Sequence, residues 1–209
     1  MTRRTSVRRA APAREAASVV GPRRRRGSPE DTRQRLLAMA AEQFERSGFS
    51  GTDTNRIARA AGYAPGTFYK HFSDKLEVFL AVYDAWIADQ WDVIAKIAAD
   101  GRDPRDKAER VAAAVLEHHR TWRGLRASVR QLVETEARVR RAYRASRLRQ
   151  LALMRDLGLE NDLANAILLF EVERIADAIA TGEVRELGLP EAAVVGHLID
   201  RIERHLAGQ

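Results

Sequence analysis

Apolar residues recur every three or four positions through most of the chain after residue 28, and no segment shows the two-residue alternation of a half-buried strand. A period of 3.6 residues places such positions on one face of an α-helix. Glycines and prolines interrupt the pattern repeatedly, which divides it into separate helices. The sequence therefore predicts an all-α protein.

Residues that start or stop helices set the predicted bounds. Ser28 followed by Pro29 is a strong start, because serine caps the first turn and proline fits its first position. Ser73 is expected to cap the long fourth helix, and Gly124 is expected to separate the fifth from the sixth. The predicted helices are 29–47, 54–61, 65–71, 74–99, 103–121, 124–134, 136–157, 161–181 and 190–207.

Pattern and charge divide the 209 residues into three parts. Residues 1–28 lack apolar periodicity and are predicted to be a disordered basic arm. This arm has nine arginines and one acidic residue, a net charge of +8, whereas the whole chain carries +7. Residues 29–75 are predicted to form a three-helix DNA-binding domain, and residues 76–209 a larger helical domain for ligand binding and dimerisation.

Several functional classes are disfavoured by what the sequence lacks. It contains no cysteine, which excludes disulfides and thiolate chemistry. No apolar run approaches the length of a membrane span. Hydrolase, P-loop and dinucleotide motifs are missing, so neither an enzyme, a cofactor nor a metal site is expected. We expect a cytoplasmic protein; the alternative for the arginine-rich start is a transit peptide.

The segment from Asp53 to Lys75 has the pattern of a helix-turn-helix. Gly62 can supply the positive φ that a tight turn between two short helices requires. Ala58 is small enough for the helices to cross closely, and the predicted apolar anchors are Ile57, Ala61, Phe68 and Phe72. In such a motif the second helix lies in the major groove of DNA.

The run AGYAPGTFYKHFSDK within this segment resembles the DNA-binding domain of TetR-family repressors. The resemblance extends from the first helix to the start of the fourth. It implies that Thr67 and Tyr69 present hydroxyls to DNA, that Lys70 and His71 read bases or phosphates, and that Lys75 binds a phosphate. The full predicted DNA-binding set is Thr52, Arg56, Pro65, Gly66, Thr67, Tyr69, Lys70, His71, Lys75, Arg23, Arg24, Arg25 and Arg26.

Two positions depart from the family pattern. Ala64 stands where a capping hydroxyl is frequent, and the loss of such a cap costs about 0.5–2 kcal/mol. Pro65 partly compensates because it fixes φ at the first helical position. Tyr63 stands where valine is frequent; it either packs beneath the turn or exposes its hydroxyl to a phosphate.

The charge distribution suggests that the arm supplies most of the attraction to DNA. Residues 29–75 contain seven basic and six acidic residues, a net charge of only +1. Phosphate attraction dominates non-specific affinity, so the arginines at 23–26, directly before the first helix, are predicted to contact DNA. They could also enter the minor groove. The alternative is a tail that only increases solubility.

The resemblance also implies a small-molecule site in residues 76–209. Apolar and hydrogen-bonding side chains share one face of helix 136–157, which suits a pocket wall. A face of helix 103–121 gives further candidates, although His118 is equally compatible with a core position. The predicted ligand-binding set is Trp86, His118, Trp122, Tyr143, Ser146, Gln150 and Phe170. Of the six arginines in 138–149, most are expected in solvent; one or two could pair with Glu171 or Glu173, or meet an acidic ligand.

Helices 161–181 and 190–207 are predicted to form the homodimer interface through two apolar stripes, unless these stripes are intramolecular core. The first stripe is Leu168, Val172, Ile175 and Ile179, and the second is Val194, Leu198, Ile202 and Leu206.

The expected function is a homodimeric repressor that binds a pseudo-palindromic DNA operator and is released by a small molecule. A sequence-tolerant nucleic-acid-binding protein acting through its arm is the alternative, and activation remains open.

Overall fold

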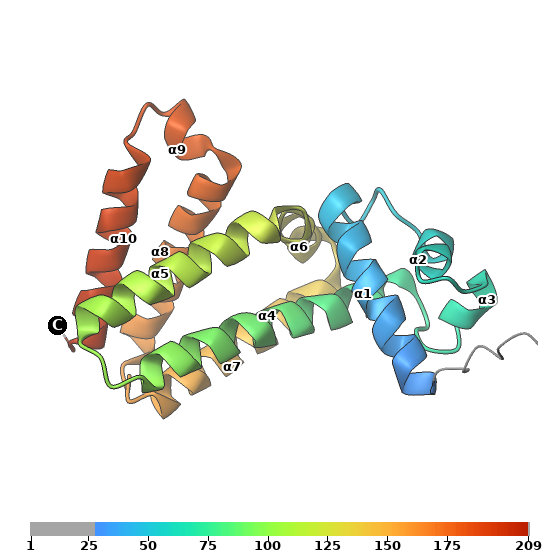
Figure 1. Ribbon diagram of the computed structural model, residues 1–209, viewed down its shortest axis with the longest axis horizontal. Helices are drawn as coiled ribbons and strands as arrows, with labels where there is room; N and C mark the ends of the chain where they lie inside the picture. Colours follow the sequence, from blue (N-terminus) through green and yellow to red (C-terminus); the bar gives the residue numbers. More distant parts are fainter. Residues whose placement is uncertain (1–27, 209) are drawn as a thin grey trace, which may run out of the picture.

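The computed structural model describes residues 28–208, and this part of the chain is all helical, with no strand (Figure 1). This confirms the predicted fold class. The helices are α1 (Pro29–Ser47), α2 (Thr54–Ala60), α3 (Pro65–Phe68), α4 (Lys75–Ala99), α5 (Pro104–Thr121), α6 (Arg123–Thr135), α7 (Ala137–Asp156), α8 (Asp162–Thr181), α9 (Glu183–Glu186) and α10 (Glu191–Leu206).

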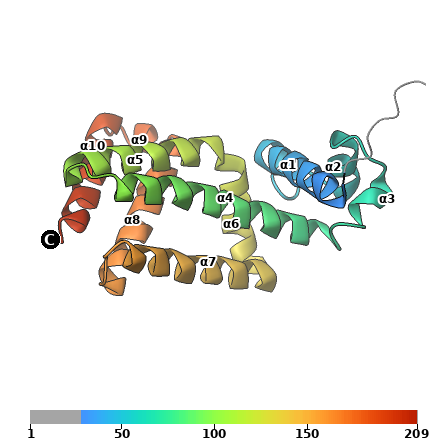
Figure 2. The ribbon, with the colours of Figure 1, turned by 60° about the horizontal axis from the view of Figure 1, so that its bottom comes forward.

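The molecule is elongated, with α1, α2 and α3 grouped at one end and α8, α9 and α10 at the other (Figure 1). The long helix α4 starts beside the first group and runs into the larger domain, where α5 and α7 flank it (Figure 2). Helix α6 packs against α1, so the two domains meet at two places, along α4 and at the α1–α6 contact.

Most helix starts agree with their predicted caps. Ser28 and Asp31 form a capping box, in which Ser28 Oγ accepts a hydrogen bond from the Asp31 amide at 3.0 Å and the Asp31 carboxylate accepts one from the Ser28 amide at 2.8 Å. The predicted cap of α4 was wrong. Asp74 accepts the Glu77 amide at 2.6 Å, whereas Ser73 donates its amide and hydroxyl to the Glu77 carboxylate.

The prediction of Gly124 as a helix break was also wrong, because Gly124 lies in the first turn of α6. Its amide donates to both Glu45 carboxylate oxygens, at 3.0 and 2.9 Å, and the Leu125 amide donates to the same carboxylate at 3.1 Å. A Cβ atom at position 124 would lie 2.0 Å from the Glu45 carbonyl oxygen. Glycine is therefore required by the close approach of α1 to α6.

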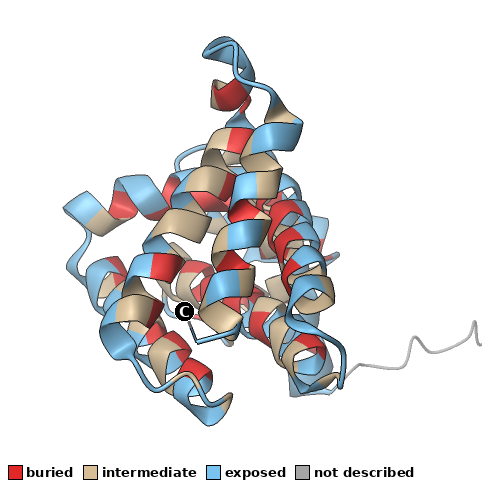
Figure 3. Cartoon of the chain, turned by 90° about the vertical axis from the view of Figure 1, so that its left-hand side faces the viewer, coloured by how far each residue is buried: buried red, intermediate tan, exposed pale blue. Residues whose placement is uncertain are grey.

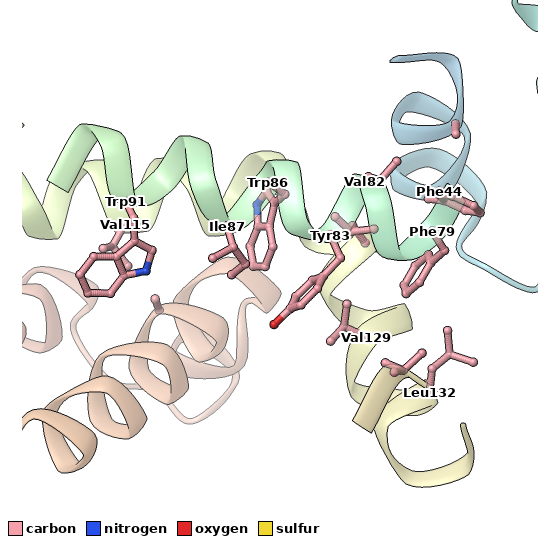
Figure 4. Close-up of a cluster of buried hydrophobic side chains, with 14 of the residues drawn as sticks. Phe44, Phe79, Val82, Tyr83, Trp86, Ile87, Trp91, Val115, Val129 and Leu132 are labelled. Carbon is pink, nitrogen blue, oxygen red and sulfur yellow. The ribbon is translucent and has the colours of Figure 1, made fainter. Parts of the chain in front are cut away.

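One continuous hydrophobic core connects the two domains. Phe44 on α1 packs edge-on against Phe79 on α4, with ring centroids 5.1 Å apart. Figure 4 shows buried side chains continuing along α4 from Phe79 to Trp91, with Val129 of α6 also in the cluster. In Figure 3 the buried residues line the facing sides of the helices, and the outer sides are exposed.

Helix α9 was not predicted, because four residues are too few to show helical periodicity.

Within residues 28–208, no helix is both long enough and apolar enough to cross a lipid bilayer.

Candidate functional site

The turn between α2 and α3 has the geometry that the helix-turn-helix motif requires. Gly62 has φ of +80°, and the amide of Tyr63 donates back to the Ala58 carbonyl at 2.9 Å, which ends α2. Ile57 and Phe68 are fully buried and fix the two helices against the core. Tyr63 is half-buried and packs against the same core, which supports the packing alternative for this residue.

Helix α3 is shorter than predicted but continues as hydrogen-bonded turns. The amides of His71 and Phe72 both donate to the Phe68 carbonyl, at 2.9 and 3.0 Å, so the backbone stays coiled beyond the end of the helix. Ala64 provides no side-chain cap, as its residue type predicts, and Pro65 occupies the first helical position.

The side chains predicted to face DNA form an accessible surface on this unit. Tyr69 is 58% exposed; its ring packs edge-on against Phe68 and its hydroxyl lies 3.0 Å from Thr54 Oγ1. Arg56 is also exposed and donates to the Gly51 carbonyl at 2.9 Å, which holds its guanidinium beside the loop before α2. Among the other predicted contacts, Pro65, Gly66 and Lys70 are exposed, and Thr67 and His71 are half-exposed.

Two residues predicted to contact DNA, Thr52 and Lys75, differ from the others in their surroundings. Thr52 is only 4% exposed, so its side chain belongs to the interior. Lys75 Nζ donates to the carbonyls of Phe49 and Thr52, at 2.8 and 3.0 Å, and lies 4.1 Å from the centroid of the Phe49 ring. Burial lowers the pKa of Lys75, although Asp53 opposes this. Lys75 therefore ties the loop before α2 to α4 with two of its three N–H groups, and its contact with a phosphate stays a prediction. Arg23, Arg24, Arg25 and Arg26 lie outside the described residues.

The larger domain encloses a cavity of about 490 Å³, in the size range of ligand sites. Its walls come from α4, α5, α6, α7, α8 and α10 and are mostly apolar. Three predicted ligand residues line it, namely Trp86, Tyr143 and Gln150.

The other four ligand predictions were wrong in position. His118 stacks on Trp86, with ring centroids 4.9 Å apart, but does not line the cavity. Burial, with His119 and Arg126 nearby, lowers the pKa of His118 to about 4, so it is neutral at pH 7. Ser146 is fully buried behind the wall, 2.8 Å from the Tyr83 hydroxyl. Trp122 lies outside the lining, and Phe170 is 59% exposed on the outer side of α8.

A charged cluster closes the end of the cavity near Trp86. Arg126 is buried; its Nε donates to Asp177 at 2.6 Å and its Nη2 to Glu173 at 2.9 Å. Arg147 pairs with Glu173, as the arginine-rich pattern of α7 allowed, and also donates to the Tyr143 hydroxyl at 2.6 Å. Burial alone would raise the pKa of Asp177, but hydrogen bonds from His119 and Arg126 lower it well below its usual range.

Arg126 and Arg130 were not among the predicted ligand residues, although their spacing in the sequence indicates a role in the interior. The two arginines are four residues apart on α6, interleaved with Leu125, Val129 and Leu132, which are all buried. Arg126 is buried and therefore requires a buried partner, whereas Arg130 is half-exposed at the edge of the same face. Here Asp177 provides that partner for both arginines.

The two stripes predicted to form the dimer interface face the interior of a single chain. Leu168, Ile179, Leu198 and Ile202 are buried in the core, and Val172 and Leu206 line the cavity. The alternative, intramolecular core, is therefore supported for the four buried residues, whereas Ile175 and Val194 are only half-buried. The outer side of α8 instead exposes Leu163, Ile167 and Phe170.

An accessible helix-turn-helix on a larger helical domain defines a DNA-binding transcriptional regulator. Residues 36–82 match the family model described as "Bacterial regulatory proteins, tetR family". Its DNA-binding domain is therefore of the TetR type, which supports a TetR-family transcriptional regulator.

Similarity to curated proteins covers only part of the chain. The chain is 36% identical over 62 residues to the HTH-type transcriptional regulator AcrR of Shigella flexneri, covering 30% of this chain and 29% of AcrR. It is 47% identical over 53 residues to SrpR of Pseudomonas putida, covering 25% of each chain. It is 33% identical over 96 residues to the transcriptional activator FasR of Mycolicibacterium smegmatis, covering 46% of this chain and 42% of FasR. The matched segments thus span less than half of these relatives.

Solved structures show the same fold over most of the chain. A TetR-family regulator described as putative, from a Rhodococcus species, superposes with a TM-score of 0.69 at 16% identity, covering 85% of this chain and 99% of that one. Another, from Mesorhizobium loti, gives a TM-score of 0.67 at 21% identity, covering 87% and 98% of the two chains.

Proposed function

We propose that this protein is a homodimeric repressor that binds an operator through α2 and α3 and is released when a small molecule enters the cavity. The observation that carries the proposal is the exposed surface of α3, with Tyr69 projecting from a rigid, buried base. Phe68 anchors that base in the core, so the exposed residues are held in position before DNA arrives. Preorganised contacts lower the entropy cost of binding.

Helix α6 provides a physical connection between the cavity and the DNA-binding domain. Its first amides are bonded to Glu45 on α1, and Ser128 Oγ accepts the Phe49 amide at 2.9 Å. The opposite side of the same helix presents Arg126, Val129 and Arg130 to the cavity. A ligand that moves α6 would therefore change the position of α1.

Tyr69→Ala is expected to weaken operator binding at least tenfold, because the exposed ring and hydroxyl would be lost from the surface that faces DNA. Leu148→Ala is the matched control, since Leu148 is 60% exposed but lies on α7. Binding is measured by fluorescence anisotropy on operator DNA and on random DNA, with circular dichroism to check the fold. Equal affinities of the two variants for the operator would remove Tyr69 from the contact set.

Deletion of residues 1–27 tests the proposed role of the basic arm. Each phosphate neutralised adds about 0.9 to the slope of log K against log salt. If three or four arginines of each arm engage, the slope falls by roughly five to seven units in the truncated dimer. Preference for the operator over random DNA should survive, because base contacts specify the sequence. An unchanged slope would leave the arm without a role in binding, and loss of all preference would favour the alternative of a sequence-tolerant nucleic-acid-binding protein.

The proposed dimer uses the outer side of α8 and the segment after α9. Among the described residues, five of the nine exposed large hydrophobic side chains lie there, namely Leu163, Ile167, Phe170, Leu187 and Leu189. Exposed apolar patches of this kind mark interaction surfaces. Because the two copies are identical, an isologous contact between these surfaces would bury both at once.

A further inference from the structure

The cavity is long and narrow rather than round. Its lining follows α4 from Tyr83 to Ala98, which corresponds to about 22 Å along the helix axis at 1.5 Å per residue. A volume of about 490 Å³ spread over that length suits an extended molecule better than a compact one.

The lining changes character along this length. Beyond Trp86 the wall is mostly apolar, with Ile87, Trp91 and Ile94 from α4 and Val115 from α5, although Gln90 and His205 also line it. At the far end, Lys107 lines the cavity but its Nζ donates to the Ala98 carbonyl at 2.8 Å, so this ammonium is already bonded. Polar groups concentrate at the end near Trp86, where Arg126, Tyr143, Arg147 and Glu173 meet.

Two buried hydrogen-bond donors at the polar end of the cavity have no acceptor. Trp86 Nε1 and Arg147 Nε are both buried and have no hydrogen-bond partner among the described residues, and both residues line the cavity. The carboxylates of Glu173 and Asp177 are occupied, because Glu173 receives Arg126 and Arg147 while Asp177 receives Arg126 and Arg130; the third carboxylate, Glu134, is exposed. An unsatisfied buried donor costs about 1–3 kcal/mol, so a ligand that accepts hydrogen bonds is favoured there.

The charges at the polar end balance. Three cations (Arg126, Arg130 and Arg147) lie there with three carboxylates (Glu134, Glu173 and Asp177), and the fourth cation of the lining, Lys107, lies at the far end. The lowered pKa of Asp177 keeps it ionised. Burial lowers the pKa of His119, so the adjacent histidine adds no further positive charge at pH 7. The two donors without partners, rather than a net charge, therefore distinguish this end of the cavity.

We infer that the cavity binds an amphiphile with an extended apolar chain and a single anionic head, of the fatty-acid type, with its carboxylate beside Arg147 and Trp86. A carboxylate supplies the acceptors that these two donors lack, and a hydrogen bond from a guanidinium to a carboxylate is stronger than one between neutral groups. The chain lies along the apolar wall of α4. This inference names the ligand class for the cavity of the proposed function.

Binding is tested with dodecanoate, dodecanol and dodecyltrimethylammonium on the full-length protein, without DNA. Trp86 and Trp91 line the cavity, so tryptophan fluorescence reports occupancy directly, and isothermal titration calorimetry gives the affinity. Dodecanoate is expected to bind at least about tenfold more tightly than the other two probes, the effect of one charge-assisted hydrogen bond.

Arg147→Gln should weaken dodecanoate binding at least about tenfold and leave dodecanol binding unchanged. Arg149→Gln is the matched control, because Arg149 lies on the same helix but bonds only to Asp84 on the exterior. Retained dodecanol binding shows that the Arg147→Gln cavity is folded. Equal affinity of the parent protein for dodecanoate and dodecanol, or an equal effect of Arg147→Gln on both, would overturn the inference.

The same probes separate this inference from the proposed function. Dodecanoate that binds tightly but leaves the operator complex intact supports the ligand class and contradicts ligand-induced release. An operator complex released by dodecanol, with no binding of dodecanoate, would support the proposed function and overturn the ligand class.

Discussion

Phe44→Ala is expected to lower the free energy of unfolding by about 3–5 kcal/mol, the usual cost of removing a fully buried aromatic ring. Phe44 has no exposed surface, and its ring contacts Phe79 at 5.1 Å and Phe49 at 6.0 Å between centroids. The cavity left by the ring would lie between α1 and α4.

Chemical denaturation followed by circular dichroism measures this change. Leu148→Ala serves as the control and should change the free energy of unfolding by less than about 0.5 kcal/mol, because Leu148 is 60% exposed. A loss below about 1.5 kcal/mol for Phe44→Ala would contradict the packing described for this cluster.

Replacing Ile167 and Phe170 by glutamate is expected to convert the dimer to monomers. Both side chains are exposed in the single chain, so charge there would not disturb the core, but two negative charges would be buried in the proposed interface. A monomer contacts only one half of a pseudo-palindromic operator, and operator affinity should fall on the order of a hundredfold or more.

Sedimentation velocity gives the oligomeric state, and anisotropy gives the affinity. Leu148→Glu is the control, because it adds the same charge at an equally exposed apolar position on α7. A double variant that remains dimeric would place the interface elsewhere. Val172 would be a poor choice for this test, since it lines the cavity and its replacement by a charged residue would disturb the ligand domain.

The helices and the helix-turn-helix could be predicted because their signals are local. Periodic apolar residues, Gly62 and the Ser28 cap each act within a few residues of sequence. The position of Gly124 could not be interpreted in the same way. A glycine that ends a helix and a glycine that allows another helix to approach look identical in sequence, and only the contact with Glu45 distinguishes them.

The site residues were predicted less well because their roles depend on tertiary contacts. Thr52 lies next to the DNA-binding motif in sequence, but its side chain is buried, and Lys75 bonds to carbonyls of the loop before α2. Tyr143, Ser146 and Gln150 share a helical face, but Ser146 lies one layer behind the cavity wall. A difference of one packing layer decides whether a side chain meets a ligand, and sequence spacing does not resolve it.

The contact of Glu45 with the start of α6 also bears on how the protein unfolds. The carboxylate satisfies amides of a helix in the other domain, and the core around Phe44 continues into that domain without interruption. A boundary at residue 75 therefore separates two functions but not two folding units. Calorimetry should show a single cooperative transition, and a fragment ending at residue 75 would lose α4 and α6, the partners that stabilise α1.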